Sequence, residues 1–387
     1  MPKRKIYLDY AATTPLDPQV LKVMLPFLKT KFGNTMSLHS LGQEAKEVLE
    51  DSREAVARLM KAKPEEIIFT SSATESNNLA LKGIAFANQT SGRHLIVSSI
   101  EHACVLESAK WLEKQGFEIT KIKVDRQGLI DPQDIKKAIK KETILVSIIH
   151  ASNEIGVLEP IEEMGEICHE KGVYFHTDAA QSFGKIPIDV NQTNIDLLTA
   201  SSHKMYGPKG AACLFVREGT KIEPLLHGGG QEMGLRSSTV NIASIVGFAE
   251  ACLIAEKVMR KESLRVSNLR DKLIKGILRI KGSHLNGHPI KRLPNVANFW
   301  FDFVEGESIV IQLDLLGIAA STGSACSSAK LEPSPVLLAI GLKPEQAHSS
   351  LRFSLGRFSS EEEINELLKV LPEVIEKLRK ISPFKLK

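Results

Sequence analysis

The sequence predicts an α/β fold, with an open, mainly parallel sheet covered by helices on both faces and a second, smaller lobe behind it. Two observations support this prediction. Between about residues 65 and 216, short runs rich in β-branched and aromatic residues alternate with helical patterns. In addition, a chain of 387 residues is long enough for a large core and two lobes.

Seven predicted strands follow one another along this stretch, and amphipathic segments such as "PIEEMGEICHEKG" (160–172) lie between several of them. The strand runs are "EIIFTSS", "HLIVSSI", "FEITKIKV", "TILVSIIH", "VYFHTDAA", "DLLTASSHK" and "AACLFVRE". In open sheets of this kind, ligands bind beyond the carboxyl ends of the strands. The polar residues that directly follow each run are therefore the candidates for a functional site.

A long helical pattern from 242 to about 280 carries a face rich in Lys, Arg and Glu, and we interpret it as the connection to the second lobe. The segments that follow are "VANFWFDF", "ESIVIQLDLLG", the Gly/Ser-rich stretch 321–335, "SLRFSLGR" and a charged helix from about residue 360. No internal repeat is visible.

Composition and charge argue against several classes of protein. The chain is 43% hydrophobic and 25% charged, and its 50 basic and 46 acidic residues leave a net charge of only +4, which favours no nucleic-acid surface. The most apolar helical stretch, 242–257, contains Glu250 and is too short to span a bilayer. The N-terminus lacks the apolar region of a signal peptide. Five scattered cysteines fit a reducing cytoplasm.

Polar residues gather directly after the predicted strands. They supply a helix start, an imidazole, amides, a carboxylate and an amine. These residues are Thr74, Glu75, His102, Asn153, Asp178, Gln181, Ser201, His203 and Lys204. Such a set suits a cofactor with several polar groups, and pyridoxal phosphate (PLP) matches it.

Each residue type has a chemical reason to be there. Thr74 at a helix N-terminus favours an anion such as phosphate. Asp178 would keep a ring nitrogen protonated, and the Lys204 amine, desolvated among small residues, would form an imine with an aldehyde. A flat His102 could stack on the ring and move protons.

Taken singly, these residues have plainer explanations. Thr74 could belong to an ordinary helix cap, Asp178 could be a turn residue, and His102 could be a core histidine. Their occurrence together favours the cofactor site, because the plainer explanations would have to apply five separate times.

The sequence resembles a cysteine desulfurase of the NifS/IscS type, a fold-type-I PLP enzyme of the class V aminotransferase group. The resemblance runs almost end to end, through "YLDYAATTP", "TSSATESNN", "EH", "NEIG", "HTDAAQS", "SSHKMYGPKG", "HGGGQEMGLRSST", "STGSACSS", "LEPS" and "HSSLRFSLGR". It implies a mainly parallel seven-stranded sheet in a large PLP-binding domain, residues 16–260. Residues 1–15 and 261–387 would form a smaller α+β domain that carries a catalytic cysteine loop.

The resemblance also implies roles at the cofactor. Lys204 would form the imine with PLP, Asp178 would face the ring nitrogen and Gln181 the ring hydroxyl, with Asn153 nearby and His102 over the ring. The residues that would line the phosphate site are Ala73, Thr74, Ser201, Ser202 and His203.

Three further roles concern the substrate and a second subunit. Thr239 would reach the phosphate from the partner subunit of a homodimer. Arg352 would pair with the substrate carboxylate, for which a bidentate guanidinium is well suited, and Asn34 would assist it.

Cys326 matches the mobile catalytic cysteine of these enzymes. A Gly/Ser-rich loop would let its thiolate reach the substrate sulfur and carry it away. The reaction implied converts L-cysteine to L-alanine and leaves a persulfide on Cys326, which passes to acceptors such as an iron–sulfur scaffold or a tRNA-thiolation enzyme. The other cysteines lie on apolar runs or helix patterns, and we expect them to be bystanders: Cys104, Cys168, Cys213 and Cys252.

Ser72, Ser202 and Ser238 stand where glycine is common in this family. Glycine at such positions permits a close approach of the backbone, so the serines could either crowd the phosphate or add hydrogen-bond donors. We expect them to be tolerated, because the chemically active positions are kept.

Other functions remain as alternatives. A selenocysteine lyase would use the same groups, whereas an aminotransferase would have no need for Cys326 on a Gly/Ser-rich loop. An inactive sulfur-transfer scaffold would not need the full catalytic set. We expect no resident metal, because the histidines do not fall at ligand spacing, although Cys326 could be a transient iron–sulfur ligand.

Overall fold

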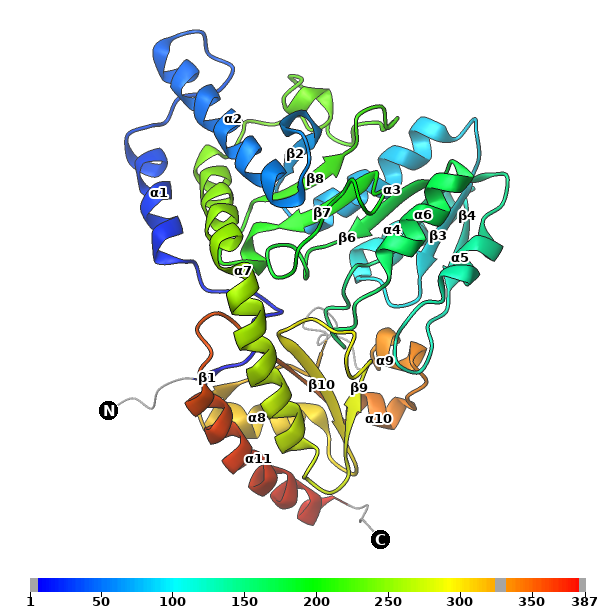
Figure 1. The fold of residues 1–387 in the computed structure, drawn as a ribbon, viewed down its shortest axis with the longest axis vertical. Coiled ribbons are helices and arrows are strands. Elements are labelled where there is room, and N and C mark those ends of the chain that lie inside the picture. Colours follow the sequence, from blue (N-terminus) through cyan, green and yellow to red (C-terminus); the bar gives the residue numbers. More distant parts are fainter. Residues whose placement is uncertain (1–5, 324–331, 383–387) are drawn as a thin grey trace.

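The structure is a computed structural model that describes residues 6–323 and 332–382. Seven strands form the large sheet in the order β2-β8-β7-β6-β5-β3-β4 (Figure 1). The two pairs that β8 makes, with β2 and β7, are antiparallel, and the other four pairs are parallel, so the expected strands and the mainly parallel arrangement are confirmed. The strands are β2 (Ile67–Thr70), β3 (His94–Ser98), β4 (Glu118–Ile122), β5 (Thr143–Ser147), β6 (Tyr174–Asp178), β7 (Leu197–Ser201) and β8 (Ala212–Val216).

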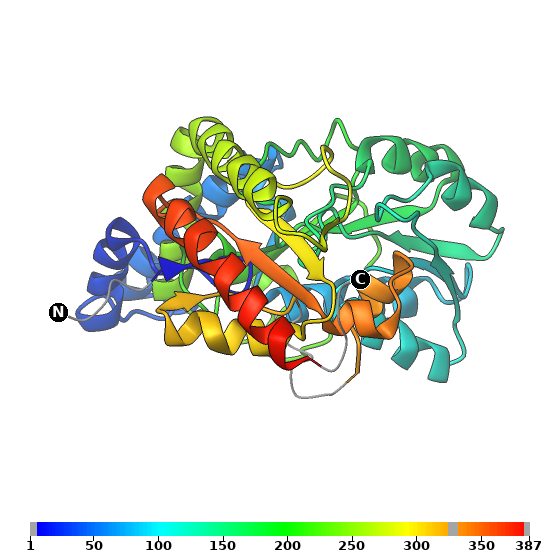
Figure 2. The same cartoon turned by 90° about the horizontal axis from the view of Figure 1, so that it is seen from below.

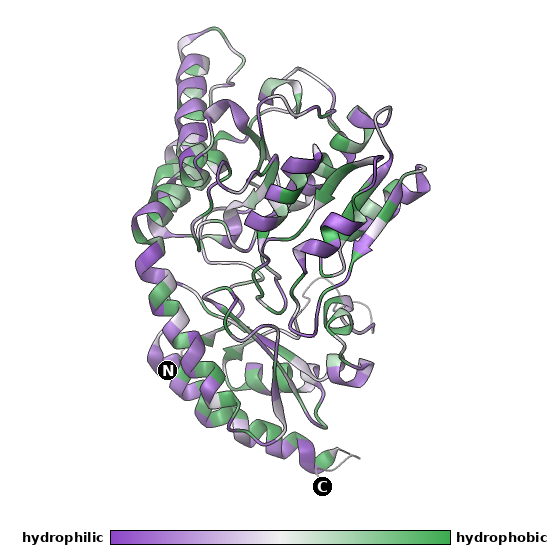
Figure 3. Ribbon diagram, turned by 45° about the vertical axis from the view of Figure 1, so that its right-hand side comes forward, coloured by the Kyte–Doolittle hydropathy of each residue, from purple (hydrophilic) through white to green (hydrophobic). Residues whose placement is uncertain are grey.

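Helices cover both faces of this sheet. Apolar side chains of α3 (Ala73–Asn88) and α4 (Ala103–Lys114) pack on one face. The opposite face is covered by α1 (Pro18–Lys29), α2 (Ser40–Met60), α5 (Pro132–Ala138), α6 (Ile161–Lys171) and the first half of α7 (Ile242–Ile277). Because both faces are covered, six of the seven strands are almost wholly buried and read as continuous apolar runs, as Figure 3 shows in green.

A second layer is built mainly from the C-terminal part of the chain. Its antiparallel sheet has the order β12-β10-β9, and Figure 2 shows α11 running beside α7 and α8 against it. A parallel pair, β1 with β11, adds the first described residues to this layer. The elements are β1 (Ile6–Tyr7), β9 (Ser283–Asn286), β10 (Val296–Phe301), β11 (Ile318–Ala319), β12 (Ser350–Ser354), α8 (Gly306–Leu315) and α11 (Glu361–Ile381).

Short elements complete the described chain, namely the 3₁₀ turns η1 (Pro64–Glu66), η2 (Ser202–Lys204) and η3 (Glu232–Gly234) and the helices α9 (Pro335–Ala339) and α10 (Pro344–His348). The helix ends follow local rules. In α11, Ser360 caps the N-terminus, and the Glu363 side chain accepts a hydrogen bond from the Ser360 backbone N–H. Arg379 and Lys380 lie in the last turn, where positive charges interact favourably with the helix dipole.

The helix α7 belongs to two hydrophobic clusters. Its first half, up to Ala255, packs with the seven-stranded sheet, and its second half, from Val266, packs with the C-terminal layer. The expected long helix near 242–280 is therefore confirmed. We propose that residues 16–260 form one domain and that residues 1–15 and 261–387 form the other, which the separate clusters support. Within the described ranges, no helix combines the length and the apolar character that a membrane crossing requires.

Candidate active site

A cavity of about 430 Å³ lies at the carboxyl edge of the seven-stranded sheet, beside the C-terminal layer. This volume is within the range of small-molecule binding sites. The structure brings together in its wall most of the predicted site residues, namely Ala73, Thr74, His102, Asn153, Asp178, Gln181, His203, Lys204 and Arg352. Residues from the segment "YLDYAATTP", Ala11 and Ala12, complete the same wall.

Lys204 is half-buried in η2, directly after β7. Its Nζ donates hydrogen bonds to the carbonyl oxygens of Ala11 and Ala12, both at 2.7 Å. The amide of Gln181 donates to the same Ala11 oxygen at 2.9 Å. The amine is thus held on the cavity wall by backbone carbonyls, with Gln181 beside it.

Asp178 ends β6 and is only 4% exposed. Its Oδ1 accepts a hydrogen bond from the Ala180 N–H at 2.9 Å, and its Oδ2 accepts one from Asn77 Nδ2 at 2.7 Å. These two bonds fix the carboxylate. The sequence did not single out Asn77, although it lies in the motif "TSSATESNN" and one turn of α3 beyond Thr74.

The first turn of α3 provides a site for an anion. Ser72, not Thr74, is the N-cap, and its hydroxyl accepts from the Glu75 N–H at 3.2 Å. Ala73 and Thr74 lie in the cavity wall at the positive end of the helix. The φ of Ser72 is −164°, which is extended backbone that any residue adopts. Glycine is therefore not needed at Ser72, and its hydroxyl helps to start the helix.

Ser202 is fully buried but does not lie in the cavity wall. Its Oγ has no hydrogen-bond partner among the described residues, and it fills space beside Gly207, where an added Cβ would come within 2.0 Å of it. The Ser202 side chain therefore does not crowd the cavity. Ser201, at the end of β7, is likewise absent from the wall, so a phosphate contact by either serine stays a prediction.

His102 caps α4, and its Nδ1 accepts a hydrogen bond from the backbone N–H of Cys104 at 3.2 Å. Burial lowers the pKa of His102, the carboxylate of Asp178 opposes this, and the positive charge of Lys204 lowers the pKa further. The net direction is downward, so the neutral imidazole is favoured at the cavity.

Cys104 is not the bystander that the sequence suggested. Its Sγ lies 3.0 Å from His102 Nδ1 and 3.1 Å from Asn77 Nδ2. The apolar helix pattern hid this position, because the contacts depend on how α3 and α4 pack against each other. The three cysteines Cys168, Cys213 and Cys252 are buried free thiols, as expected of structural residues.

His203 lies in the cavity wall next to Lys204. Burial, and then the charges of Lys204, Lys209 and Lys185, lower the pKa of His203 to about 4. Its Nδ1 is 3.1 Å from the hydroxyl of Thr13. A neutral His203 can therefore donate a hydrogen bond to a bound anion without adding a positive charge to the site.

Arg352 reaches the cavity from β12, and its side chain is 2% exposed. One Nη donates to Asp9 and the other to the Asn153 carbonyl, both at 2.8 Å. The Nε is buried and has no partner among the described residues. Since a guanidinium carries five N–H donors, Arg352 retains donors for a carboxylate.

Two buried carboxyl groups in the wall were missed by the sequence reasoning, although both lie in quoted motifs. Burial raises the pKa of Glu101 to about 8, and its Oε1 accepts from Ser98 Oγ and the Ile149 N–H, both at 2.6 Å. Burial also raises the pKa of Glu154, whose Oε2 accepts from Ser334 Oγ at 2.6 Å. Because their pKa values are raised, both carboxyl groups hold a proton more readily than an exposed glutamate does.

Besides Ser201 and Ser202, two other predicted residues are not brought to the cavity. Asn34 is exposed, and its Oδ1 accepts from the Met36 N–H at 3.0 Å within a local turn, so Asn34 does not assist Arg352 within this chain. Thr239 is also exposed and away from the wall. Cys326 lies outside the described residues.

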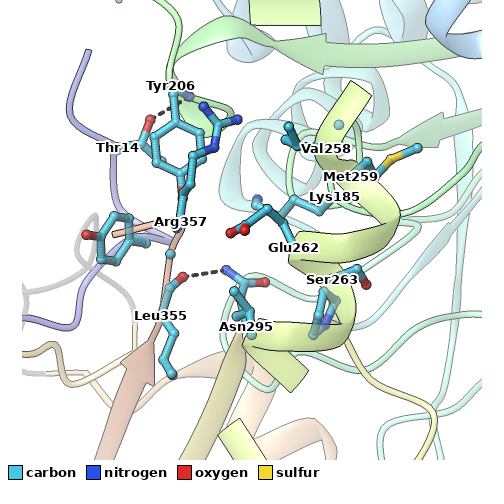
Figure 4. Close-up of a pocket in the computed structure, with 15 residues that line it drawn as sticks. Thr14, Lys185, Tyr206, Val258, Met259, Glu262, Ser263, Asn295, Leu355 and Arg357 are labelled. Carbon is cyan, nitrogen blue, oxygen red and sulfur yellow. Dashed lines mark hydrogen bonds between the residues drawn. The ribbon is translucent and has the colours of Figure 1, made fainter. Parts of the chain in front are cut away.

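A second cavity, shown in Figure 4, lies between α7 and the turn after β6. Lys185 in its wall donates to the Gln181 carbonyl at 2.7 Å, and burial together with the charge of Lys204 lowers the pKa of Lys185 to about 7. With about 50 Å³, this space has room for on the order of three or four water molecules. Of these two cavities, the larger one is therefore the candidate ligand site.

The residues of the larger cavity fit PLP. The fit rests on an amine held at the wall by Lys204, a buried and fixed carboxylate at Asp178, and a helix N-terminus at Ala73 and Thr74 for a phosphate. The guanidinium of Arg352, with its unpartnered Nε, adds a site for a second anion in the same wall.

The segment that contains Thr239 is anchored by a buried ion pair. Glu232, at φ 49°, binds both Nη atoms of Arg53 at 2.8 and 2.9 Å and accepts the Phe69 N–H at 2.7 Å. The side chains of Arg53 and Glu232 are 5% and 3% exposed. The pair holds a left-handed backbone conformation that is otherwise unfavourable for glutamate.

Replacing Glu232 by alanine is expected to lower the free energy of unfolding by about 3–5 kcal/mol, because a buried guanidinium would lose its counter-charge. Urea unfolding followed by circular dichroism measures this change. The matched control is Glu50→Ala, whose carboxylate binds the same Arg53 at 3.2 Å but is 54% exposed. That variant should lose less than about 1 kcal/mol, and equal losses in the two variants would contradict the role of the buried pair.

Comparisons with known proteins match this chain over almost its whole length. The family model of aminotransferase class-V matches residues 6–367. Cysteine desulfurase IscS of Dictyoglomus turgidum is 54% identical over 384 residues, covering 99% of this chain and 98% of the relative. A solved NifS-like protein superposes with a TM-score of 0.91 at 36% identity, covering 97% of this chain and 100% of the other. The structure of SspA in complex with cysteine gives a TM-score of 0.81 at 38% identity, over 92% of this chain and 100% of that one.

Proposed function

This chain belongs to the aminotransferase class-V family, and we propose that it acts on L-cysteine, releasing L-alanine and leaving the sulfur as a persulfide on Cys326. It is a PLP-dependent cysteine desulfurase. The observation that carries the proposal is the cavity in which the Lys204 amine, the Asp178 carboxylate and the Arg352 guanidinium share one wall.

Several side chains of the cavity would hold the cofactor. The amine of Lys204 would bind the aldehyde of the cofactor, and Asp178 and Gln181 would contact its ring. Ala73 and Thr74 would bind its phosphate. Asn153, His203 and the two serines Ser201 and Ser202 are the remaining proposed neighbours. When bound, PLP supplies an electron sink for bonds at the α-carbon of the substrate.

Arg352 would bind the substrate carboxylate with the N–H donors that Asp9 and Asn153 leave available. Because the guanidinium is already fixed by these two partners, it loses little freedom when the substrate binds. His102 would take part in proton movement at the reacting carbon, with a neutral imidazole that donates through one ring nitrogen and accepts through the other.

Cys326 would act as the nucleophile. Its thiolate would attack the substrate sulfur, so that an S–S bond forms as the Cβ–S bond breaks. The electron pair of the broken bond would stay on the carbon skeleton, which takes up a proton at Cβ and leaves as L-alanine, while the substrate sulfur stays on Cys326 as the outer sulfur of the persulfide. The chain on either side of this segment supports the assignment. Gly323 bonds to Ser321, which pairs with Arg352, and Ser334 is held by Glu154 of the cavity wall.

A homodimer would complete the phosphate site through Thr239 of the partner subunit. Large apolar side chains support such an interface, because they are exposed on and after α1 and again in the segment before Thr239. These residues are Leu28, Phe32, Met36, Leu38, Leu225, Leu226 and Met233. Sulfur would then pass to an acceptor protein, such as an iron–sulfur scaffold or a tRNA-thiolation enzyme, in the cytoplasm.

The test is a paired assay with L-cysteine. With a thiol reductant in excess, the purified protein is expected to release alanine and sulfide in equal amounts. Without reductant, alanine should stop at about one equivalent per active site, because the persulfide is not removed. Visible absorption of the bound cofactor with no alanine formed would overturn the proposal.

A further inference from the structure

Asn77 and Cys104 connect two residues of the candidate active site that do not bond to each other directly. The Nδ2 of Asn77 lies 2.7 Å from Asp178 Oδ2 and 3.1 Å from Cys104 Sγ. Cys104 Sγ in turn lies 3.0 Å from His102 Nδ1. The contacts form one chain of hydrogen bonds from Asp178 to His102.

The direction of each bond in this chain follows from the chemistry of the groups. An amide NH₂ can only donate, so Asn77 gives one hydrogen to Asp178 and the other to the Cys104 sulfur. The side chain of Thr74 also hydrogen-bonds to the Cys104 sulfur, where its hydroxyl can act as a donor. The thiol hydrogen can then point to His102 Nδ1, which also accepts from the backbone N–H of Cys104. Both donors require that Nδ1 carries no proton.

The other nitrogen of the ring is the one available to a ligand. His102 lies in the cavity wall, and its Nε2 has no hydrogen-bond partner in residues 6–323 and 332–382. A neutral imidazole with an unprotonated Nδ1 must carry its proton on Nε2. We propose that Cys104 and Asn77 are positioning residues that hold His102 with Nδ1 as acceptor and with a proton-bearing Nε2 available to the cavity, and that they tie this state to Asp178.

The charges around the chain favour the same state. Burial and the nearby Asp178 raise the pKa of Cys104 to about 12, so that the thiol keeps the hydrogen it donates. The ionisable groups that face His102 and Cys104 are Asp178 on β6, Lys204 in η2 and Glu101 at the end of the β3–α4 connection. Asn77 is fully buried, so its two bonds do not compete with solvent.

The inference rests on the proposed function only in that the proposed function makes His102 a catalytic residue. Its first test does not depend on activity. The full-length protein with its cofactor is labelled with ¹⁵N-histidine, and the His102 signals are assigned with a His102→Gln variant. The expected result is an unprotonated Nδ1 and a protonated Nε2. In Cys104→Ala, the loss of the thiol donor should raise the pKa of His102 by about 0.5–1 unit, because that donor stabilises the neutral ring.

Matched variants separate positioning from simple loss of a thiol. Cys104→Ser keeps a donor and should retain the parent tautomer and pKa, and Cys104→Val removes the donor with less change in volume. Cys168→Ala removes a buried thiol on α6 and should leave the His102 signals as they are. The midpoint of the acidic limb of the pH profile of kcat/KM should rank these variants in the same order as the pKa of His102 does.

Two results would overturn the inference. One is a protonated Nδ1 in the parent protein. The other is that Cys104→Ala and Cys104→Val both show the same His102 tautomer, the same His102 pKa and the same pH profile as the control Cys168→Ala. An unprotonated Nδ1 in a parent protein that forms no alanine would leave the positioning intact and refute the proposed function instead.

Discussion

Replacing Lys204 by alanine is expected to abolish the visible absorption of the bound cofactor and to reduce alanine formation on the order of 10³-fold or more. The Lys204 amine is the group held on the cavity wall by the carbonyl oxygens of Ala11 and Ala12. Without this side chain, the cavity wall would have no amine at this position to bind the aldehyde of the cofactor. Absorption spectra and alanine release measure the two losses.

The matched control is Lys209→Ala, an exposed lysine five residues further along the same loop. This variant should keep both the absorption band and the rate, since Lys209 does not lie in the cavity wall. Retention of the visible band in Lys204→Ala would refute the assignment of Lys204, whatever the activity.

Replacing Cys326 by alanine is expected to remove both sulfide and alanine formation, again on the order of 10³-fold or more, while the visible absorption of the cofactor remains. The reason is that sulfur can leave the substrate only by transfer to a nucleophile, and the described part of the cavity wall offers no substitute. Cys104 is the one described cysteine near the cavity, and burial raises its pKa to about 12, so it supplies almost no thiolate at neutral pH.

The two variants therefore fail in different ways, and this difference is the check. Lys204→Ala loses the absorption band, whereas Cys326→Ala keeps it and binds L-cysteine without releasing alanine. A Cys326→Ala protein that still released alanine and sulfide in equal amounts would remove the persulfide from the mechanism. Cys168→Ala serves as the control for loss of a thiol.

The sheet was predictable from the sequence because its strands are buried on both faces. Runs such as "TILVSIIH" are mostly apolar, and several of the strands are followed by a polar residue that lies in the cavity wall. The antiparallel course of β8 was not predictable strand by strand, because it depends on pairing with β2 and β7.

The site was predictable where a residue stands at the end of a strand or in a specific motif. Asp178 and Lys204 are of this kind. Asn77 and Cys104 were missed because their contacts depend on how α3, α4 and β6 pack together, which no local pattern encodes. The resemblance implied that Asn34 assists Arg352, but within this chain its side chain is held in a local turn.

The pairing of β1 with β11 has a consequence for the nascent chain. Ile6 and Leu8 belong to the hydrophobic cluster of the C-terminal layer, and Ile6 pairs with Ile318. During synthesis at about 5–20 residues per second, the partner strand emerges from the ribosome roughly 300 residues, or about 15–60 s, after β1. The seven-stranded sheet can fold during that interval, whereas the first strand must wait with its apolar side chains uncovered, so the layer that contains β1 is the last to close.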